Sequence, residues 1–240
     1  AWEMTNYNAG AAGIEPFYAI PNRKLTYLPA DPPLRQGAYR ALASTANNFA
    51  RETHIDAWVR RLSEDPLAFR LRHITDARLR AVLEAAATAF GWGQRAPTGD
   101  HGFGIACGAD KGSYVAACVE VEAEPASGTL RVQRVVEAFE CGALINPDNV
   151  RAQVEGAIIQ GLGGALLESV RFANGRILNP DFGGYRVPRF ADIPEIEVVL
   201  LDRKDIPSAG AGETPIIAIA PAIANAVHAF IGSLHHLPFG

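Results

Sequence analysis

The sequence has little sulfur and no excess of basic residues. Its three cysteines, Cys107, Cys118 and Cys141, match neither a disulfide framework nor the spacing of a Cys-x-x-Cys metal site or an iron–sulfur cluster. The six histidines form no His-Glu-x-x-His zinc pattern. With 22 basic and 26 acidic residues the formal charge is −4, which argues against nucleic acid as a partner.

Long apolar runs are also missing. The longest, residues 215–230, is too short for a membrane span and contains Pro221 and His228, so we interpret it as a core helix and expect no transmembrane segment. No signal peptide opens the chain, which starts at Ala1 without an initiator Met, and we expect it to be part of a longer protein. The sequence does not distinguish a cytoplasmic from a periplasmic location. It also does not decide whether the protein associates with a membrane through a partner.

What is present is an ordinary globular composition, with 48% hydrophobic and 20% charged residues over 240 positions. Residues 1–35 predict loops with one or two short strands. A helix is expected from Ser44 onward, and Asp65-Pro66 and Thr75-Asp76 start two more. Gly91 ends the last of these. The residues proposed to form the apolar face of the first helix are Ala46, Phe49, Ala50, Thr53, Ala57 and Val59-Arg60.

The second half of the chain predicts strands at 102–107, 114–124, 130–139 and 196–201, with a turn at 125–128. Asn146-Pro147 caps a helix that has apolar residues four apart from Val150 to Leu166, and Asn174-Gly175 marks a hairpin turn. These elements predict an α+β fold of antiparallel sheets packed with helices. We divide it into a loop-and-helix lobe, residues 1–100, and an α+β lobe, residues 101–240.

Glu213 is the acid whose position most needs an explanation. It follows Gly212 and precedes Thr214-Pro215 at the start of the apolar run. One interpretation is a helix start, with Thr214 as N-cap, Pro215 at the first helical position, and the acid near the positive end of the helix dipole. The other is a catalytic base carried on a glycine loop. The residues alone leave both open.

The other motifs are weaker evidence for a function. The pairs Gly102-Phe-Gly104 and Gly161-Leu-Gly163 lack the strand–loop–helix context of a nucleotide site and predict structural glycines. No Gly-x-Ser-x-Gly elbow supports a Ser/His/Asp hydrolase. Glu155 lies in a glycine-containing helix, where exposure or a local helix contact is the simpler interpretation.

Three ordered segments of the sequence form a recognisable set. They are Gly37-Ala-Tyr-Arg40, Asn146-Pro147 with Gln153-Val-Glu155-Gly156, and Ala211-Gly212-Glu213-Thr-Pro215. Together they resemble the molybdopterin-binding large subunits of the xanthine dehydrogenase/aldehyde oxidase family, the molybdenum hydroxylases. The first is similar to the family's Ala-Phe-Arg-Gly-Phe-Gly loop, the second to its Asn-Pro…Gln-Val-Glu-Gly-Ala helix, and the third to its Val-Gly-Glu-Pro-Pro loop. Their order and spacing extend the resemblance over nearly the whole chain, and within the family it is most similar to the branch of isoquinoline 1-oxidoreductase and membrane-associated aldehyde dehydrogenase subunits.

The resemblance implies a molybdopterin cofactor and oxidation of an aldehyde or N-heteroaromatic carbon, with water supplying the oxygen. Whether the cofactor is the cytosine dinucleotide form stays open. Glu213 would act as general base, and no side chain would ligate the metal. Arg40, Gln153, Ala211 and Gly212 would contact the cofactor. Partners would be the remainder of the large subunit, a separate iron–sulfur small subunit and a small-molecule substrate.

The sequence departs from the family pattern after Arg40. Ala41 stands where the family has glycine, and Leu42 replaces an aromatic that borders the substrate pocket. The family's upstream cofactor loops are absent from these 240 residues, so we expect the isolated fragment to be inactive. The alternative function is a non-catalytic scaffold or interaction module that has the same fold without the cofactor.

Overall fold

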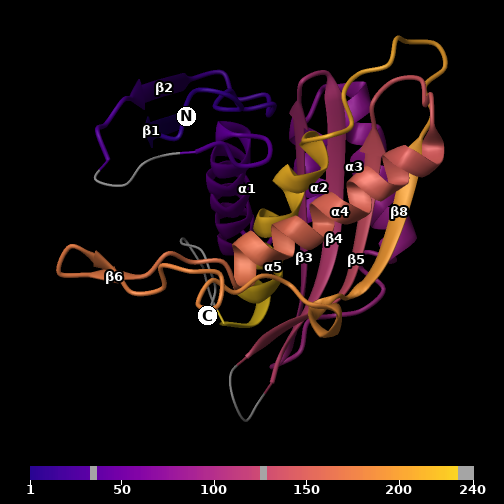
Figure 1. Cartoon of the computed structure of the whole chain (residues 1–240). Coiled ribbons are helices and arrows are strands. Elements are labelled where there is room, and N and C mark those ends of the chain that lie inside the picture. Colours follow the sequence, from indigo (N-terminus) through magenta and orange to yellow (C-terminus); the bar gives the residue numbers. More distant parts are fainter. Residues whose placement is uncertain (33–36, 125–128, 232–240) are drawn as a thin grey trace.

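The computed structural model describes residues 1–32, 37–124 and 129–231. Its centre is a four-stranded sheet in the order β3-β4-β5-β8 (Figure 1). Strands β3 (His101–Asp110), β4 (Ser113–Ala123) and β5 (Leu130–Glu140) form an antiparallel meander, and β8 (Glu195–Leu201) joins β5 in parallel. The predicted strands and the α+β class are confirmed, with one parallel pair in the sheet. The predicted turn at 125–128 lies outside the described residues.

Both faces of the sheet are covered, and alternation along the strands divides the core. Val115, Ala117 and Val119 of β4 belong to the cluster under α4 (Pro147–Leu166) and α5 (Ile219–Ile231). Ala116 and Cys118, which point the other way, pack with α3 (Ala77–Phe90). This double burial explains why the strands are nearly continuous hydrophobic runs.

The helix ends follow the local signals in the sequence. Asp65 accepts a hydrogen bond from the Ala68 amide (2.8 Å) and caps α2 (Pro66–His73). Asp76 caps α3, which ends at left-handed Gly91. Asn146 accepts from the Asn149 amide (3.0 Å) at the start of α4. These predicted boundaries are confirmed.

Helix α1 (Ala43–Arg61) is where the predicted packing is wrong. Ala46 and Ala50 of the proposed apolar face are exposed, and the buried face is instead largely polar. It can be buried because its groups find partners: Glu52 forms an ion pair with buried Arg70 (3.0 Å), and Asn48 accepts from Arg51 (2.6 Å). The buried polar residues of α1 are Ser44, Asn47, Asn48, Arg51, Glu52, Thr53 and Asp56.

The remaining elements are small. Strands β1 (Trp2–Tyr7) and β2 (Arg23–Leu28) pair in parallel, and β6 (Phe172–Ala173) and β7 (Arg176–Ile177) form the hairpin predicted at Asn174-Gly175. Two 3-10 turns are η1 (Phe190–Asp192) and η2 (Thr214–Ala218). The division into two lobes stays a prediction. The buried cluster around α3 draws residues from both sides of residue 100.

None of the helices in the described part of the chain is long and apolar enough to cross a membrane.

Candidate functional site

A strained turn at Arg40–Leu42 precedes α1. Ala41 (φ 63°) and Leu42 (φ 51°) both occupy positive φ, which is unfavourable for residues that carry a Cβ. The turn is held by the Leu42 amide, which donates to the Tyr39 carbonyl (2.8 Å), and by the Thr45 hydroxyl, which donates to the Arg40 carbonyl (2.7 Å). Such strain persists only where its surroundings enforce it, and it clusters at functional sites.

Arg40 ties three distant segments together. Its Nε donates to the Gly212 carbonyl (2.7 Å), and its Nη2 donates to the carbonyl and the side-chain Oε1 of Gln153 (3.1 and 3.0 Å). Its Nη1 reaches Gln160 Oε1 at 3.5 Å. One guanidinium therefore joins the loop before α1, helix α4 and the loop before η2.

All of these acceptors are neutral oxygens. Within the described residues no carboxylate lies within hydrogen-bonding distance of the Arg40 guanidinium. Partial burial lowers the pKa of Arg40, with Glu137 opposing that shift, yet arginine stays protonated in proteins. The site thus carries a cation whose charge no direct contact compensates.

Glu213 is held at both carboxylate oxygens. Oε1 accepts from the Ala41 amide (3.2 Å), and Oε2 forms an ion pair with Lys111. The predicted N-cap at Thr214 is wrong: Glu213 occupies the N-cap position, and Thr214 is buried and donates its hydroxyl to the Asp110 carbonyl (3.0 Å). Pro215, predicted at the first helical position, is instead the second residue of η2 and lies within its first turn.

Four of the predicted site residues therefore meet: Arg40, Gln153, Gly212 and Glu213. Ala211 lies one residue away, partly buried against the core, and Leu42 has an exposed side chain beside the turn. Their catalytic, cofactor and substrate roles stay predictions.

Sequence reasoning missed two charged residues here, Lys111 and Glu137. Lys111 lies in the β3–β4 turn, 102 residues from its partner Glu213. Glu137 lies on β5 on the same face as Val135 and Phe139 and is fully buried. Neither of its oxygens has a hydrogen-bond partner among the residues that the structure describes. An acid at an inward position of a hydrophobic strand was the one available signal for it.

Burial raises the pKa of the Glu137 carboxyl well above its usual 4.5, and the nearby Arg40 guanidinium opposes that shift. Burial thus favours the neutral form of this acid, which lies near the cationic residue that organises the site.

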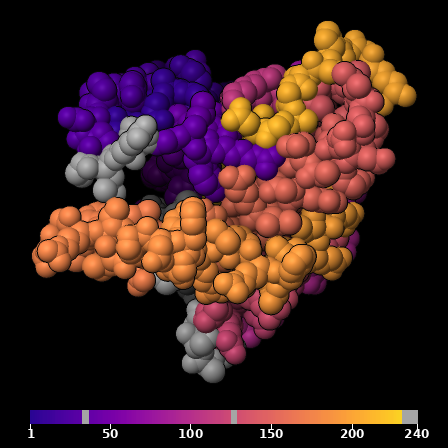
Figure 2. Space-filling model, in the orientation of Figure 1, coloured from indigo at the N-terminus to yellow at the C-terminus, as the bar shows by residue number. Residues whose placement is uncertain are grey.

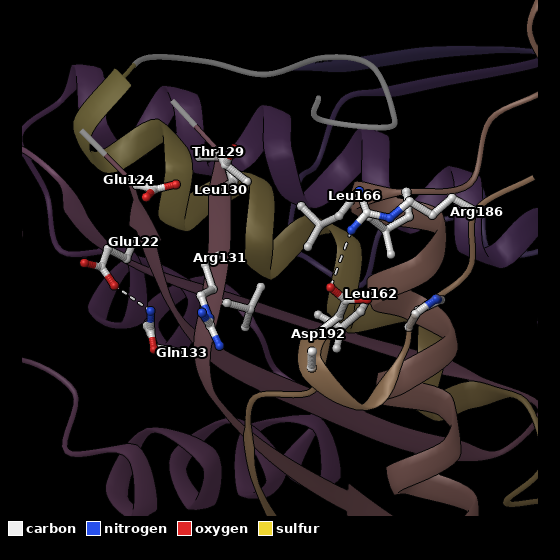
Figure 3. Close-up of a pocket in the computed structure, with 14 residues that line it drawn as sticks. Glu122, Glu124, Thr129, Leu130, Arg131, Gln133, Leu162, Leu166, Arg186 and Asp192 are labelled. Atoms are coloured by element: carbon white, nitrogen blue, oxygen red, sulfur yellow. Dashed lines mark hydrogen bonds and ion pairs between the residues drawn. The ribbon is translucent and has the colours of Figure 1, made fainter. Parts of the chain in front are cut away.

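A separate cavity lies away from this site. A groove of about 750 Å³ runs between the β4–β5 strands, the C-terminal end of α4 and the segment that leads to η1 (Figure 3). Arg186 and Asp192 form an ion pair (3.5 Å) on one side, and Gln133 donates to Glu122 (2.5 Å) on the other. None of the predicted site residues lines it.

The described residues contain no group of three or more His, Cys, Asp or Glu side chains that could hold a metal ion. Cys107, Cys118 and Cys141 are buried and free.

Comparison with known families gives a match over residues 47–194 to the molybdopterin cofactor-binding domain. The chain belongs to this family. The family resemblance drawn from the sequence is confirmed, and the chain's cofactor is molybdopterin. Gln153 lies inside the matched span, whereas Arg40 and Glu213 lie outside it.

Relatives of this family are long redox subunits. The chain is 37% identical to the beta subunit of isoquinoline 1-oxidoreductase from Brevundimonas diminuta over 83% of its own length and 26% of that protein. It is 30% identical to a nicotinate dehydrogenase subunit of Pseudomonas putida over 88% of its length and 19% of that protein. The chain thus spans about a quarter or less of these relatives.

Solved structures show the same fold. Quinoline 2-oxidoreductase from Pseudomonas putida 86 matches with a TM-score of 0.80 at 15% identity, covering 94% of this chain and 54% of that one. Aldehyde oxidoreductase from Desulfovibrio gigas matches with a TM-score of 0.78 at 16% identity, covering 94% of this chain and 43% of that one.

The arrangement around Arg40 fits an anionic, bulky cofactor. The charge of Arg40 is free of a directly bound carboxylate, and a Cβ placed on Gly212 would meet nothing within 4 Å. Because Gln153 Oε1 already accepts from Arg40, the side-chain NH₂ remains as the donor for a ligand.

Proposed function

We propose that this chain is part of a molybdenum hydroxylase that oxidises an aldehyde or an N-heteroaromatic compound, with water as the source of oxygen and Glu213 as general base. The observation that carries the proposal is the Glu213 carboxylate, held by the Ala41 amide beside the Arg40–Gln153–Gly212 cluster. The substrates named for the relatives, isoquinoline and nicotinate, support the heteroaromatic class.

The molybdenum cofactor, when bound, supplies the redox chemistry. The residues of this chain bind it and move protons. Arg40 and Gln153 offer donors to the cofactor, and Gly212 leaves room for it. Glu213 takes up the proton that the attacking oxygen loses, a role that contributes roughly 10²–10⁴-fold to a rate.

Electrons leaving the cofactor need an acceptor. The three cysteines of this chain are buried and free, so the proposal assigns electron transfer to a separate iron–sulfur subunit. The remainder of the large subunit would complete the cofactor site. The relatives named as subunits support such an assembly.

The decisive experiment replaces Glu213 by Gln in the complete enzyme. This change removes the proton acceptor but keeps the size of the side chain, so we expect turnover to fall by at least about 100-fold. Molybdenum and pterin content, measured by elemental analysis and fluorescence, should stay near wild type. Gln153→Ala should instead reduce cofactor content, because it removes an amide from the cofactor side.

Glu155→Gln is the matched control, since Glu155 lies in α4 and has no part in the proposed base chemistry. It should leave turnover unchanged. Near-normal activity of Glu213→Gln would overturn the assignment of the base. A complete protein purified without molybdenum and pterin would favour the scaffold alternative.

A further inference from the structure

The β3–β4 turn is fastened to the loop that carries Glu213. Two contacts, neither involving Glu213, make the attachment. The Thr214 hydroxyl donates to the Asp110 carbonyl (3.0 Å), and the Ser113 hydroxyl donates to the Gly210 carbonyl (2.6 Å). They flank Lys111 on both sides, so the backbone of this residue is fixed relative to the loop.

Lys111 itself has a demanding backbone conformation. Its φ of 50° lies in the left-handed region, where a residue with a Cβ is uncommon. The following Gly112 is also left-handed (φ 81°), and its carbonyl accepts from Arg78 (3.1 Å). The fold therefore holds a lysine at a position that favours glycine or asparagine.

The side chain of Lys111 completes the surroundings of the Glu213 carboxylate. Its ammonium contacts Oε2, while Oε1 receives the Ala41 amide (3.2 Å), so each oxygen is restrained by a different segment. Both side chains are partly exposed, at 47% for Lys111 and 38% for Glu213. Ion pairs this exposed add little to folding stability, so stability does not account for the pair.

We propose that Lys111 is a positioning residue for Glu213, fixing the orientation of its carboxylate through Oε2 while leaving the proton to be taken up at the other oxygen. The inference rests on the proposed role of Glu213 as base. It adds the β3–β4 turn to the two loops and the helix α4 that the proposed function already uses.

Restraint of a reacting group acts mainly on the rate of the chemical step. In the complete enzyme, Lys111→Met should lower kcat by about 10-fold and change KM less than about twofold, since the substrate itself loses no contact. Lys111→Arg keeps the charge and should restore kcat to within about threefold of wild type. Lys204→Met is the matched control, because Lys204 pairs with Asp202 (3.6 Å) and is 83% exposed.

A second readout needs no turnover. Trace acetylation followed by mass spectrometry measures the reactivity of each lysine amine, and Lys111 should label severalfold faster in Glu213→Gln, with Lys204 as internal reference. Unchanged labelling would overturn the pairing.

The two proposals fail in different ways. If Glu213→Gln is inactive but Lys111→Met keeps the wild-type kcat, the positioning role is wrong and the base stands. If Lys111→Met and Lys111→Arg lose activity equally, charge is not what matters and the inference also falls. If Glu213→Gln stays active, the proposed function fails first.

Discussion

At the scale of the residue, Glu137 is a buried carboxyl group without a hydrogen-bond partner in the described part of the chain. It is fully buried, its two oxygens lack hydrogen bonds within the described structure, and burial raises its pKa well above 4.5. A buried polar group without a partner costs free energy that a hydrocarbon of similar size would not. The acid is therefore expected to lower the stability of the fold.

We expect Glu137→Leu to raise the free energy of unfolding by about 1–3 kcal/mol at neutral pH, since it removes an unpaired buried acid. The gain should depend on pH with a definite sign. Between the ordinary pKa near 4.5 and the raised folded-state value, the native state holds a proton that the unfolded chain has released, so wild-type stability falls as pH rises.

Denaturant unfolding of both proteins at pH 5 and pH 8 measures this, and the advantage of Glu137→Leu should be larger at pH 8. Glu195→Leu serves as control for replacing a glutamate by leucine, because the Glu195 side chain is 72% exposed. An equal gain at both pH values would mean that Glu137 is ionised in the native protein.

At the scale of elements, helix α5 packs directly on β3 because two glycines of β3 have no Cβ that would collide with the helix. A Cβ on Gly104 would overlap the Ala222 carbonyl oxygen and the Ala226 amide, and one on Gly102 would overlap the Ala226 carbonyl oxygen. The prediction that Gly102 and Gly104 are structural is confirmed. The obstacles are mostly helix backbone, so a small rotation of a side chain does not relieve them.

Gly104→Ala should therefore push α5 away from the sheet and lower the free energy of unfolding by about 1–3 kcal/mol or more, as overpacking does. Thermal unfolding followed by circular dichroism tests this. Gly99→Ala is the matched control, because a Cβ there meets nothing within 4 Å, and it should change stability by less than about 0.5 kcal/mol. Equal melting temperatures for the two variants would contradict the close packing.

Some of these elements could be predicted from the sequence and others could not. Capping residues and strand alternation are local signals, so α2, α3, α4 and the β3–β5 meander could be predicted. The polar buried face of α1 could not, because its partners, such as Arg70 for Glu52, come from other elements. The site was found through its resemblance to a family, whereas Lys111 lies 102 residues from Glu213 and belongs to no recognised segment.

For the whole molecule, the notable surface is that of residues 169–192, here called the arm, whose β6–β7 hairpin projects from the body (Figures 1 and 2). Its large apolar side chains are unusually open to solvent: Phe182 is 94% exposed, Phe190 101% and Phe172 66%. Clustered exposed apolar residues mark interaction surfaces. Because the chain matches only 26% and 19% of the length of these two relatives, we expect the rest of the large subunit to cover this arm.

The chain produced alone should then self-associate through the arm. We expect Phe182→Ser combined with Phe190→Ser to reduce that association, as measured by light scattering, without lowering the melting temperature, since both rings are exposed. Phe139→Ser is the contrasting control, because Phe139 is fully buried and its loss should unfold the protein. If the double variant self-associates as strongly as wild type, the self-association surface is not the arm.

The long-range hydrogen bonds of the Arg40 guanidinium also bear on the order in which parts of the chain fold. Its bonds to Gln153 and Gly212 close loops of 113 and 172 residues, whereas the β3–β5 meander closes through short turns. Closing loops of that length costs conformational entropy before the contacts that close them stabilise the chain. We therefore expect these contacts to form late in folding. Molybdopterin is then expected to bind after these contacts have formed, and a mutation that slows the closing of those loops is expected to reduce cofactor loading before it affects turnover.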